Sequence, residues 1–302
     1  MNFRKFDSPP WPFFAVESCV MKKGLVLEGG ALRVIFSCGV LDVFMESGVE
    51  FDGMMTVSAG ACFGCNFKSR QIGRAVRFNM QYAGDKRYCS WRSFFKTGNL
   101  FNKEFAYHTI PEKLDLFDFD AFRKNPVEFY IAATNIESGK AEFKKFDECD
   151  ERCLEFMRAS AAMPIVQQIV DFDGRKYLDG GIADSIPLKA FEGMGFDRNL
   201  VILTQPKNFV KEKNPLLPLI RLKYHKYPNL IKTVENRHKV YNEETKYVFD
   251  QAKSGSCFVI CPDSPLGISR AEKNPDELKR IYEMGRRIAL LKLPEIRKFF
   301  SI

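Results

Sequence analysis

Near the start of the chain, short apolar runs alternate with segments in which apolar residues recur at helical spacing. Residues 24–27 form an apolar run with β character, and apolar side chains then recur at helical spacing from Val34 to Phe44. A second buried strand is predicted at residues 54–57, and a helix rich in small residues opens after Ser58. This β-α-β-α order predicts parallel strands joined by right-handed crossovers.

The middle of the chain adds an aromatic-rich insertion. Residues 71–122 carry closely spaced aromatic side chains without regular alternation, so we expect an inserted helical cap rather than further strands. The Asp173-Gly174 turn signal predicts a β-hairpin that exits into Asp179-Gly180-Gly181. The other elements expected before Pro206 are strands at 127–132, 141–143 and 200–203 and helices at 153–162 and 188–194.

The chain after Pro206 is more charged than the part before it. We expect a long charged helical region to about Asp250, then a strand at 257–261 and a last helix at 275–291. These elements predict an α/β fold with a mostly parallel sheet and a helical C-terminal region. The expected division is a poorly ordered arm at 1–21, an α/β domain at 22–206 and an accessory region packed on it at 207–302.

The composition suits a globular protein of enzyme size. The 302 residues are 45% hydrophobic, which is enough to fill a sizeable core. No apolar run approaches the roughly 18 to 20 residues that span a bilayer, and the first residues lack the apolar segment of a secretory signal. Nine cysteines spread over predicted core elements indicate reduced thiols. We therefore expect a cytoplasmic protein.

Cys62 and Cys65 have the C-x-x-C spacing that metal and redox sites use. No second Cys pair or His cluster follows at ligand distance, and Cys behaves as a small hydrophobe on an apolar helix face. We therefore interpret the pair as core residues and expect no metal site. His108, His225 and His238 are taken as structural or exposed.

The formal net charge is +8, and basic residues gather after Pro206, between Lys207 and Lys239. Such a cluster attracts nucleic acid or the anionic head groups of lipids, but most such clusters are solvated faces without a specific partner. We expect no nucleic-acid partner. Peripheral contact with an anionic membrane is expected only if other features indicate a lipid substrate.

Ser58 stands at the junction between the second predicted strand and the following helix. A serine in a strained turn at such a junction presents its hydroxyl at the edge of a sheet. Ala59 and Gly60 leave room around that turn, and the helix N-terminus directs free N–H groups at a developing oxyanion. Ser58 is therefore a candidate nucleophile, although a serine in such a place is by itself more often a helix N-cap.

A second Gly-rich turn, Gly29-Gly30-Ala31, follows the first predicted strand. Adjacent parallel strands bring their strand-to-helix junctions side by side, so the amides of Gly30 and Ala31 can face the Ser58 hydroxyl as an oxyanion hole. Arg33 is either a surface charge, a brace for this loop or a contact for a phosphate group. Nucleotide binding here is a weaker interpretation, because G-x-G-x-x-G is not satisfied.

A serine nucleophile needs a base, and Asp179 is the candidate. No histidine has a strand-end setting like that of Ser58, whereas Asp179 leaves a predicted strand into Gly180-Gly181. A carboxylate can act directly as the base when it is held near the serine and partly desolvated. The sequence therefore predicts a Ser-Asp pair rather than a triad. The alternative for Asp179 is an ordinary Asp-Gly turn residue.

Several segments, taken together and in this order, resemble the blocks of the patatin-like phospholipase family. They are Leu27–Gly30, Arg33, Val57–Ala61, Ala159–Pro164 and Asp179–Gly181, and the match covers about residues 22–206. The segments 237–242 and 262–268 are similar to the C-terminal region of a bacterial branch of that family. The resemblance implies a three-layer α/β/α fold, hydrolysis of lipid acyl esters by a Ser58-Asp179 dyad, and no metal or cofactor. It also implies an oxyanion hole at Gly29, Gly30 and Ala31 and supporting roles for Arg33, Ala59, Gly60 and Gly180.

The chain departs from that family at three positions. The family usually has Gly where this chain has Ala31, Val34 and Thr56. Thr56 adds a β-branched side chain beneath the serine turn, and Ala31 penalises any positive φ by about 1 kcal/mol or more. These departures motivate an alternative function, a catalytically weakened protein of the same fold that binds lipid or a protein partner.

Overall fold

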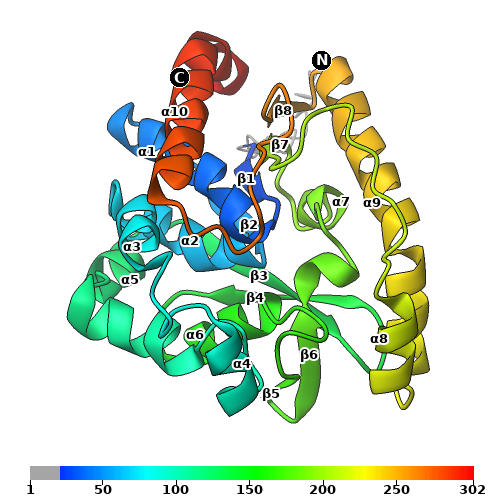
Figure 1. Cartoon of the computed structure of the whole chain (residues 1–302). Helices are drawn as coiled ribbons and strands as arrows, with labels where there is room; N and C mark the ends of the chain where they lie inside the picture. Colours follow the sequence, from blue (N-terminus) through cyan, green and yellow to red (C-terminus); the bar gives the residue numbers. More distant parts are fainter. Residues whose placement is uncertain (1–20) are drawn as a thin grey trace, which may run out of the picture.

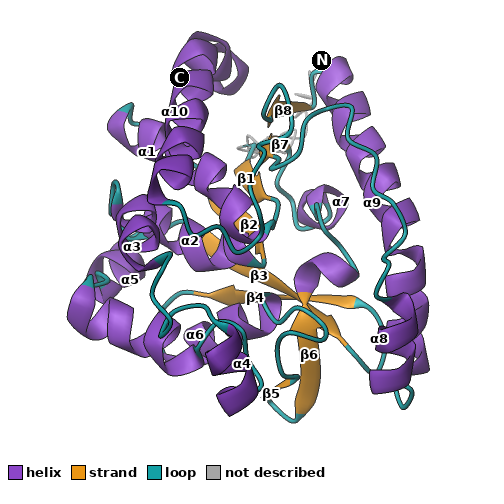
Figure 2. Ribbon diagram, in the orientation of Figure 1, coloured by secondary structure: helices purple, strands orange, loops and turns teal. Residues whose placement is uncertain are grey.

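The computed structural model describes residues 21–302, and its centre is one mixed, mostly parallel sheet (Figures 1 and 2). The arm expected at 1–21 lies, except for Met21, outside the described residues. The strand order is β5-β6-β3-β2-β1-β7-β8, and β4 pairs with β3 outside this path. The strands are β1 (Lys23–Leu27), β2 (Gly53–Val57), β3 (Glu128–Asn135), β4 (Ala141–Phe146), β5 (Val170–Phe172), β6 (Arg175–Asp179), β7 (Arg198–Ile202) and β8 (Cys257–Ile260).

The central strands run parallel, as their sequence order predicts. β1 lies between β2 and β7, and all three are parallel, with Leu27 opposite Thr56 on one side and Ile202 on the other. β3 and β8 continue the parallel pairing at either side, whereas β4, β5 and β6 pair antiparallel. β5 and β6 form the hairpin that the Asp173-Gly174 turn predicts, and β3 and β4 form a second hairpin. Both are antiparallel because a tight turn can join only antiparallel neighbours.

Helices cover both faces of the sheet. On β1, Leu25 and Leu27 belong to one hydrophobic cluster and Val26 to a second one. Because successive side chains of a strand point to opposite faces, the two clusters fill the two sides of the sheet. The larger cluster includes residues of α1 (Ile35–Glu46), α2 (Ala59–Lys68), α6 (Glu151–Ser160) and α10 (Pro275–Phe300), and the smaller one includes residues of α7 (Leu188–Glu192). The long helix α9 (Pro228–Ser254) contributes residues to both clusters. The three-layer α/β/α prediction is therefore confirmed.

The helical elements follow the predicted order. The aromatic insertion at 71–122 is helical as expected, and it contains α3, α4, η2 and α5. The helical segments before β7 are η1 (Ala31–Val34), α1 (Ile35–Glu46), α2 (Ala59–Lys68), α3 (Arg74–Tyr82), α4 (Trp91–Thr97), the π-helix η2 (Phe105–Leu114), α5 (Phe119–Lys124), α6 (Glu151–Ser160), η3 (Gly180–Ile182) and α7 (Leu188–Glu192). Within residues 21–302, no helix is long and apolar enough to cross a bilayer.

The region after Pro206 differs in two places from what the sequence predicts. The expected continuous helical region is a loop followed by two helices, α8 (Leu217–Lys223) and α9 (Pro228–Ser254). Pro228 explains the break, because proline disfavours helical backbone in the residue before it and is well placed at the start of a helix. The last helix, α10 (Pro275–Phe300), continues beyond the expected end at 291. Its final turn is retained because the ring of Phe300 packs against that of Phe51, with centroids 5.5 Å apart.

The C-terminal region is joined to the rest of the fold by strand pairing and by helix packing. β8 pairs with β7 at the edge of the sheet. α10 lies beside α1, where Tyr282 donates a 2.6 Å hydrogen bond to Asp42 and Arg286 forms a 2.8 Å ion pair with Glu46 (Figure 1). α9 runs along the opposite side of the molecule (Figure 1). The two long C-terminal helices therefore flank the sheet on its two faces.

Candidate active site

Ser58 lies in a tight turn between β2 and α2. Its backbone has φ 55° and ψ −128°, a conformation that non-glycine residues rarely adopt. The first turn of α2, Ala59 and Gly60, is buried against the end of β1. The side chain of Ser58 is itself largely buried but lines the cavities described below. The turn therefore holds the hydroxyl at the sheet edge in the way that the sequence predicts for a nucleophile.

A hydrogen-bond chain holds the Ser58 turn in place. The backbone N–H of Ser58 donates to Ser160 Oγ over 2.7 Å, and Ser160 Oγ donates to the Ala132 carbonyl over 2.6 Å. Ser160 ends α6 and Ala132 lies in β3, so three separate elements meet at this point. Both bonds are buried, and a buried hydrogen bond of this kind costs about 1–3 kcal/mol to break on one side. Ser160 therefore positions the strained turn.

Asp179 ends β6 and faces Ser58. The Ser58 hydroxyl donates to Asp179 Oδ2 over 2.8 Å, and the amide of Gly181 donates to Asp179 Oδ1 over 2.8 Å. The Asp179 backbone is also held, because its N–H donates to Ala162 and its carbonyl accepts from Thr134, at 2.9 Å and 2.8 Å respectively. Each carboxylate oxygen thus has one donor. The structure therefore brings the two predicted residues together.

Gly180 permits the close approach of this turn to β3. A Cβ atom at Gly180 would lie 2.2 Å from the carbonyl oxygen of Ala132. No side chain larger than hydrogen fits at that distance, so the residue after Asp179 has to be glycine. The position of Asp179 relative to Ser58 depends on this packing.

Burial raises the pKa of Asp179 above its ordinary value. The positive charge of Arg237 and the hydrogen bonds from Ser58 and Gly181 act in the opposite direction, but the loss of solvation is the larger effect. A carboxylate with a raised pKa is a stronger base than one in water. Its ionised form can therefore accept a proton from the hydroxyl that it already contacts.

The Gly-rich turn after β1 lies directly beside Ser58. A Cβ atom at Gly29 would lie 2.8 Å from the Cβ of Ser58, so only glycine permits this approach. Within residues 21–302, no hydrogen bond occupies the amides of Gly30 and Ala31, whereas Arg33 N–H bonds to the Gly30 carbonyl at 3.2 Å. Free amides beside a serine hydroxyl are suitable donors for an oxyanion.

The three departures from the family pattern are accommodated differently. Ala31 has φ 51°, so the side chain that replaces glycine is held in the left-handed region. Thr56 is fully buried and donates its hydroxyl to the Tyr130 carbonyl over 2.7 Å. Val34 belongs to the larger hydrophobic cluster. Backbone strain therefore arises at Ala31 and not at the other two positions.

Glu28 connects the Gly-rich turn to two distant elements. Its buried carboxylate accepts hydrogen bonds from the Thr204 amide over 2.6 Å and from the Tyr241 hydroxyl over 2.8 Å. Thr204 follows β7 and Tyr241 lies in α9. The charge of Glu28 also lies near Arg33, whose pKa is lowered mainly by burial. α9 of the C-terminal region thus supports the loop that carries the candidate oxyanion donors.

Two cavities open beside Ser58, and they differ in chemistry. The first, of about 120 Å³, is mainly apolar and extends under the aromatic insertion. Among its lining residues are Cys62, Phe63, Phe78, Tyr88, Phe101 and Tyr107. The second, of about 290 Å³, is lined by Gly29, Asp179 and several basic side chains. Some aromatic residues of the insertion therefore line a cavity at the candidate nucleophile.

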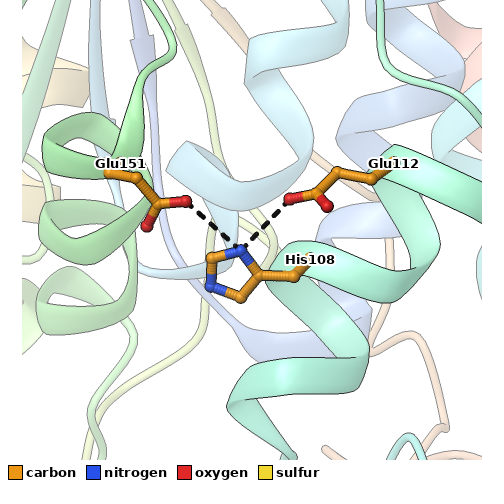
Figure 3. A group of neighbouring side chains, drawn as sticks. All are labelled: His108, Glu112 and Glu151. Carbon is orange, nitrogen blue, oxygen red and sulfur yellow. Dashed lines mark hydrogen bonds and ion pairs between the residues drawn. The ribbon is translucent and has the colours of Figure 1, made fainter.

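His108 forms a cluster that the sequence did not reveal. Its Nδ1 atom lies 3.2 Å from a Glu112 oxygen and 3.5 Å from a Glu151 oxygen (Figure 3). Within residues 21–302, these side chains are the group whose ligand atoms gather closely enough for an ion, within 4.8 Å of one another. Both carboxylates are exposed and face the same ring nitrogen (Figure 3). A hydrogen bond between His108 and Glu112 accounts for their approach, and we assign this cluster no catalytic role.

Cysteine is not part of the candidate site chemistry. The cysteines within residues 21–302 are free thiols, and most of them are buried. Burial raises the pKa of Cys62 to about 11, which keeps its thiol protonated and unreactive at neutral pH. Cys65 donates to the Cys62 carbonyl within α2. The pair is part of the helix face that borders the apolar cavity.

Sequence reasoning missed most of the residues that support the site. Ser160 and Arg237 lie in segments that resemble family blocks, and Lys211 and Arg237 belong to the basic cluster, but the sequence predicts no site role for any of the three. Arg270 was not singled out. Arg237 Nε donates to the Gly181 carbonyl, next to Asp179. Nothing in the local sequence pattern marks these side chains, because they reach the site from distant segments.

Two family models match parts of this chain. A family model described as patatin-like phospholipase matches residues 25–192. A second model, a domain of unknown function (DUF6363), matches residues 227–301. Ser58 and Asp179 both lie within the first matched range, and Arg237 and Arg270 lie within the second.

Several curated proteins are similar to this chain in sequence. An uncharacterized protein of Escherichia coli (strain K12), YjjU, is 28% identical over 267 residues, which cover 87% of this chain and 74% of that protein. Lysophospholipase NTE1 of Chaetomium globosum is 25% identical over 212 residues, and lysophospholipase nte1 of Neurospora crassa is 26% identical over 205 residues. Each of these two alignments covers 64% of this chain but only 13% of the fungal protein.

One solved structure was also found to be similar. VipD from Legionella pneumophila aligns with 91% of this chain and 67% of its own, at 11% sequence identity and a TM-score of 0.45.

Proposed function

Because this chain belongs to the patatin-like phospholipase family, a family of lipid acyl hydrolases, we propose that it cleaves lipid acyl esters with Ser58 as nucleophile and Asp179 as base. The observation that carries the proposal is the 2.8 Å hydrogen bond from the Ser58 hydroxyl to Asp179 Oδ2. It joins the two residue types that the chemistry requires, and one of them, Ser58, lines an apolar cavity.

The proposed reaction has two steps. Ser58 Oγ attacks the acyl carbonyl carbon while its proton passes to Asp179 Oδ2, and the amides of Gly30 and Ala31 hold the oxyanion. The tetrahedral intermediate then collapses, and the leaving alcohol takes the proton from Asp179. Water attacks the acyl-enzyme in the second step and gives a proton to Asp179. Collapse releases the fatty acid and returns that proton to Ser58.

The two cavities support this assignment of substrate. An acyl chain needs an apolar channel, and the cavity bordered by Phe63 and Phe101 ends at Ser58. The polar part of the lipid would then occupy the second cavity, on the Asp179 side. Neither cavity requires a metal or a cofactor for the reaction proposed.

A fluorophosphonate probe tests the proposal directly. Such probes phosphonylate a serine only when its hydroxyl is activated and an oxyanion hole is present. We expect labelling at Ser58 in the folded chain and none in Ser58→Ala.

The strain at Ala31 motivates the second candidate function, a weakened family member that binds lipid or a protein partner. Silence of the probe on folded protein would favour that second function.

We further propose peripheral contact with anionic membranes through the C-terminal region. Lys207, Lys213 and Lys226 are exposed there, and on α8 the side chain of Leu222 is 74% exposed. Basic and apolar side chains on one surface are suited to a lipid interface. Co-sedimentation should increase when phosphatidylglycerol is added to phosphatidylcholine vesicles. Sedimentation that does not depend on the anionic lipid would contradict the proposal.

A further inference from the structure

The second cavity beside Ser58 collects basic side chains from four separate parts of the chain. Arg33 comes from η1, Lys211 from the loop after β7, Arg237 from α9 and Arg270 from the loop before α10. Three of the four lie outside residues 25–192, the range matched by the patatin-like phospholipase model. The C-terminal region therefore supplies most of the positive charge at this cavity.

These four cations are without carboxylate partners in the part of the chain that the structure describes. No ion pair within 4.0 Å involves any of them, although Arg and Lys side chains elsewhere in residues 21–302 form many such pairs. Arg33 Nε is buried without any hydrogen bond, and Arg237 makes its side-chain bond to a carbonyl, that of Gly181. Cations that converge in excess of the nearby carboxylates are costly unless a ligand completes the site.

The charge balance of the cavity indicates what kind of ligand fits. Glu28 and Asp179 are the carboxylates among its lining residues, so four positive and two negative side chains leave a net charge of about +2. Glu28 already accepts hydrogen bonds from Thr204 and Tyr241, which are neutral groups. A phosphate monoester carries about two negative charges at neutral pH and has three acceptor oxygens. It therefore matches the cavity in both charge and hydrogen-bonding capacity.

The charges of the other three cations affect the pKa of Lys211. Burial, together with the charges of Arg237, Arg270 and Arg33, lowers the pKa of Lys211 to about 8, while Glu28 acts in the opposite direction. The Nζ atom of Lys211 also lies 4.0 Å from the centroid of the Tyr241 ring. The four cations line one cavity and lie close enough to influence one another, which favours a shared anion there.

From this geometry we propose that Arg33, Lys211, Arg237 and Arg270 form a binding site for the phosphate group of an acyl-lipid substrate. The inference rests on the proposed function and names its substrate class, an acyl ester of a glycerol phosphate with a free phosphate monoester. Ala31 and Ser58 line both cavities, so an ester held at Ser58 directs its acyl chain into one cavity and its phosphate into the other. A neutral head group leaves the four cations without a partner, and a choline head group adds another cation.

The test measures binding to the full-length Ser58→Ala variant, so that no turnover occurs. Calorimetry compares monohexanoylglycerol phosphate with monohexanoylglycerol, two soluble esters that differ only in the phosphate. We expect the phosphate ester to bind at least about tenfold more tightly, as one or two charge-assisted hydrogen bonds would produce. Adding Lys211→Gln or Arg270→Gln should reduce its affinity about tenfold each, whereas Lys211→Arg should retain it.

Lys213→Gln is the matched control. Lys213 lies two residues from Lys211 and is exposed, but it does not line the cavity, so the same charge change there should leave the affinity unaltered. Equal affinity for the two esters, or an equal loss in Lys213→Gln and Lys211→Gln, would overturn the proposal. Thermal unfolding of every variant identifies any that does not fold, and the two independent substitutions keep the test decisive.

Inorganic phosphate separates a head-group site from a site for the free ion. We expect it to bind more weakly than the phosphate ester and to be displaced by that ester. Tight binding of inorganic phosphate that the ester does not displace would reject the head-group assignment. Because the measurement uses the inactive variant, its outcome is independent of probe labelling at Ser58, and failure of the proposed function is recognised separately.

Discussion

The Ser58 hydroxyl donates a hydrogen bond to Asp179 Oδ2 over 2.8 Å, although 121 residues separate the two side chains along the chain. Ser58 leaves the parallel centre of the sheet, and Asp179 leaves the antiparallel hairpin beside it. The contact thus depends on the junction of two sheet regions at β3, which pairs with both β2 and β6.

Loss of either member of the pair should abolish ester hydrolysis. Ser58→Ala removes the nucleophile and Asp179→Asn removes the base while keeping its shape, so each should lower the turnover of a short-chain p-nitrophenyl ester by about a thousandfold or more. Ser264→Ala, at an exposed loop serine, serves as the control. Turnover that survives in both site variants would reject the Ser-Asp mechanism.

Ser160→Ala should impair catalysis without touching the substrate. The change removes the acceptor for the Ser58 amide and the donor to the Ala132 carbonyl, so the strained turn loses its support. We expect kcat to fall by about tenfold or more with little change in KM, and stability to fall by about 1–3 kcal/mol. An unaltered kcat in a variant that is measurably destabilised would show that Ser160 has only a structural role.

Ala31→Gly should relieve backbone strain beside the candidate oxyanion donors. Ala31 has φ 51°, which glycine adopts without a steric penalty, and the gain should be roughly 0.5–1 kcal/mol after allowance for the greater freedom of glycine in the unfolded chain. Equilibrium denaturation measures this change. Gly29→Ala is the opposing variant, because its Cβ would lie 2.8 Å from that of Ser58, and it should reduce both stability and activity.

As the pH is lowered, activity should be lost at a higher pH than an ordinary aspartate base would give. Asp179 must be ionised to accept the Ser58 proton, and burial raises its pKa above the usual value of about 3.9. Protonation as the pH falls through the raised pKa therefore inactivates the enzyme. The acid limb of the kcat/KM profile reports this pKa, and a limb at or below the ordinary value would contradict the role of a desolvated base.

Asp184 and Glu244 should make the fold less stable at neutral pH than at mildly acid pH. Burial raises the pKa of Asp184 to about 6 and that of Glu244 to about 8, and the charge of Asp184 further disfavours ionisation of Glu244. The native state therefore holds protons that the unfolded chain has already released. Stability should therefore decline as the pH rises from the unfolded-state values through the raised ones. Glu244→Gln should flatten that decline in urea titrations between about pH 4 and pH 9. An unchanged pH dependence would show that the pair is solvated.

The sequence predicted the order of the elements and the type of nearly every one. Hydrophobic periodicity and turn residues are local signals, and the Asp173-Gly174 turn lies where it was predicted, with both residues at positive φ. Ser58 and Asp179 could be singled out for the same reason, because a strand-to-helix junction and a hairpin exit are visible in a few neighbouring residues. The predicted end of α10 was wrong because the contact between Phe51 and Phe300 is not local.

What the sequence determined by itself is therefore the set of strands, helices and turns, together with the two residues whose settings are local. Tertiary structure alone decided that Ser160 supports the nucleophile, that Tyr241 reaches Glu28, and that the cations of the C-terminal region converge on one cavity. The physical reason is that periodicity reports which face of an element is buried, but not which distant side chains meet there. Charges that read as a solvated basic cluster along the chain are gathered around Ser58 only when α9 and the loop before α10 pack against the sheet.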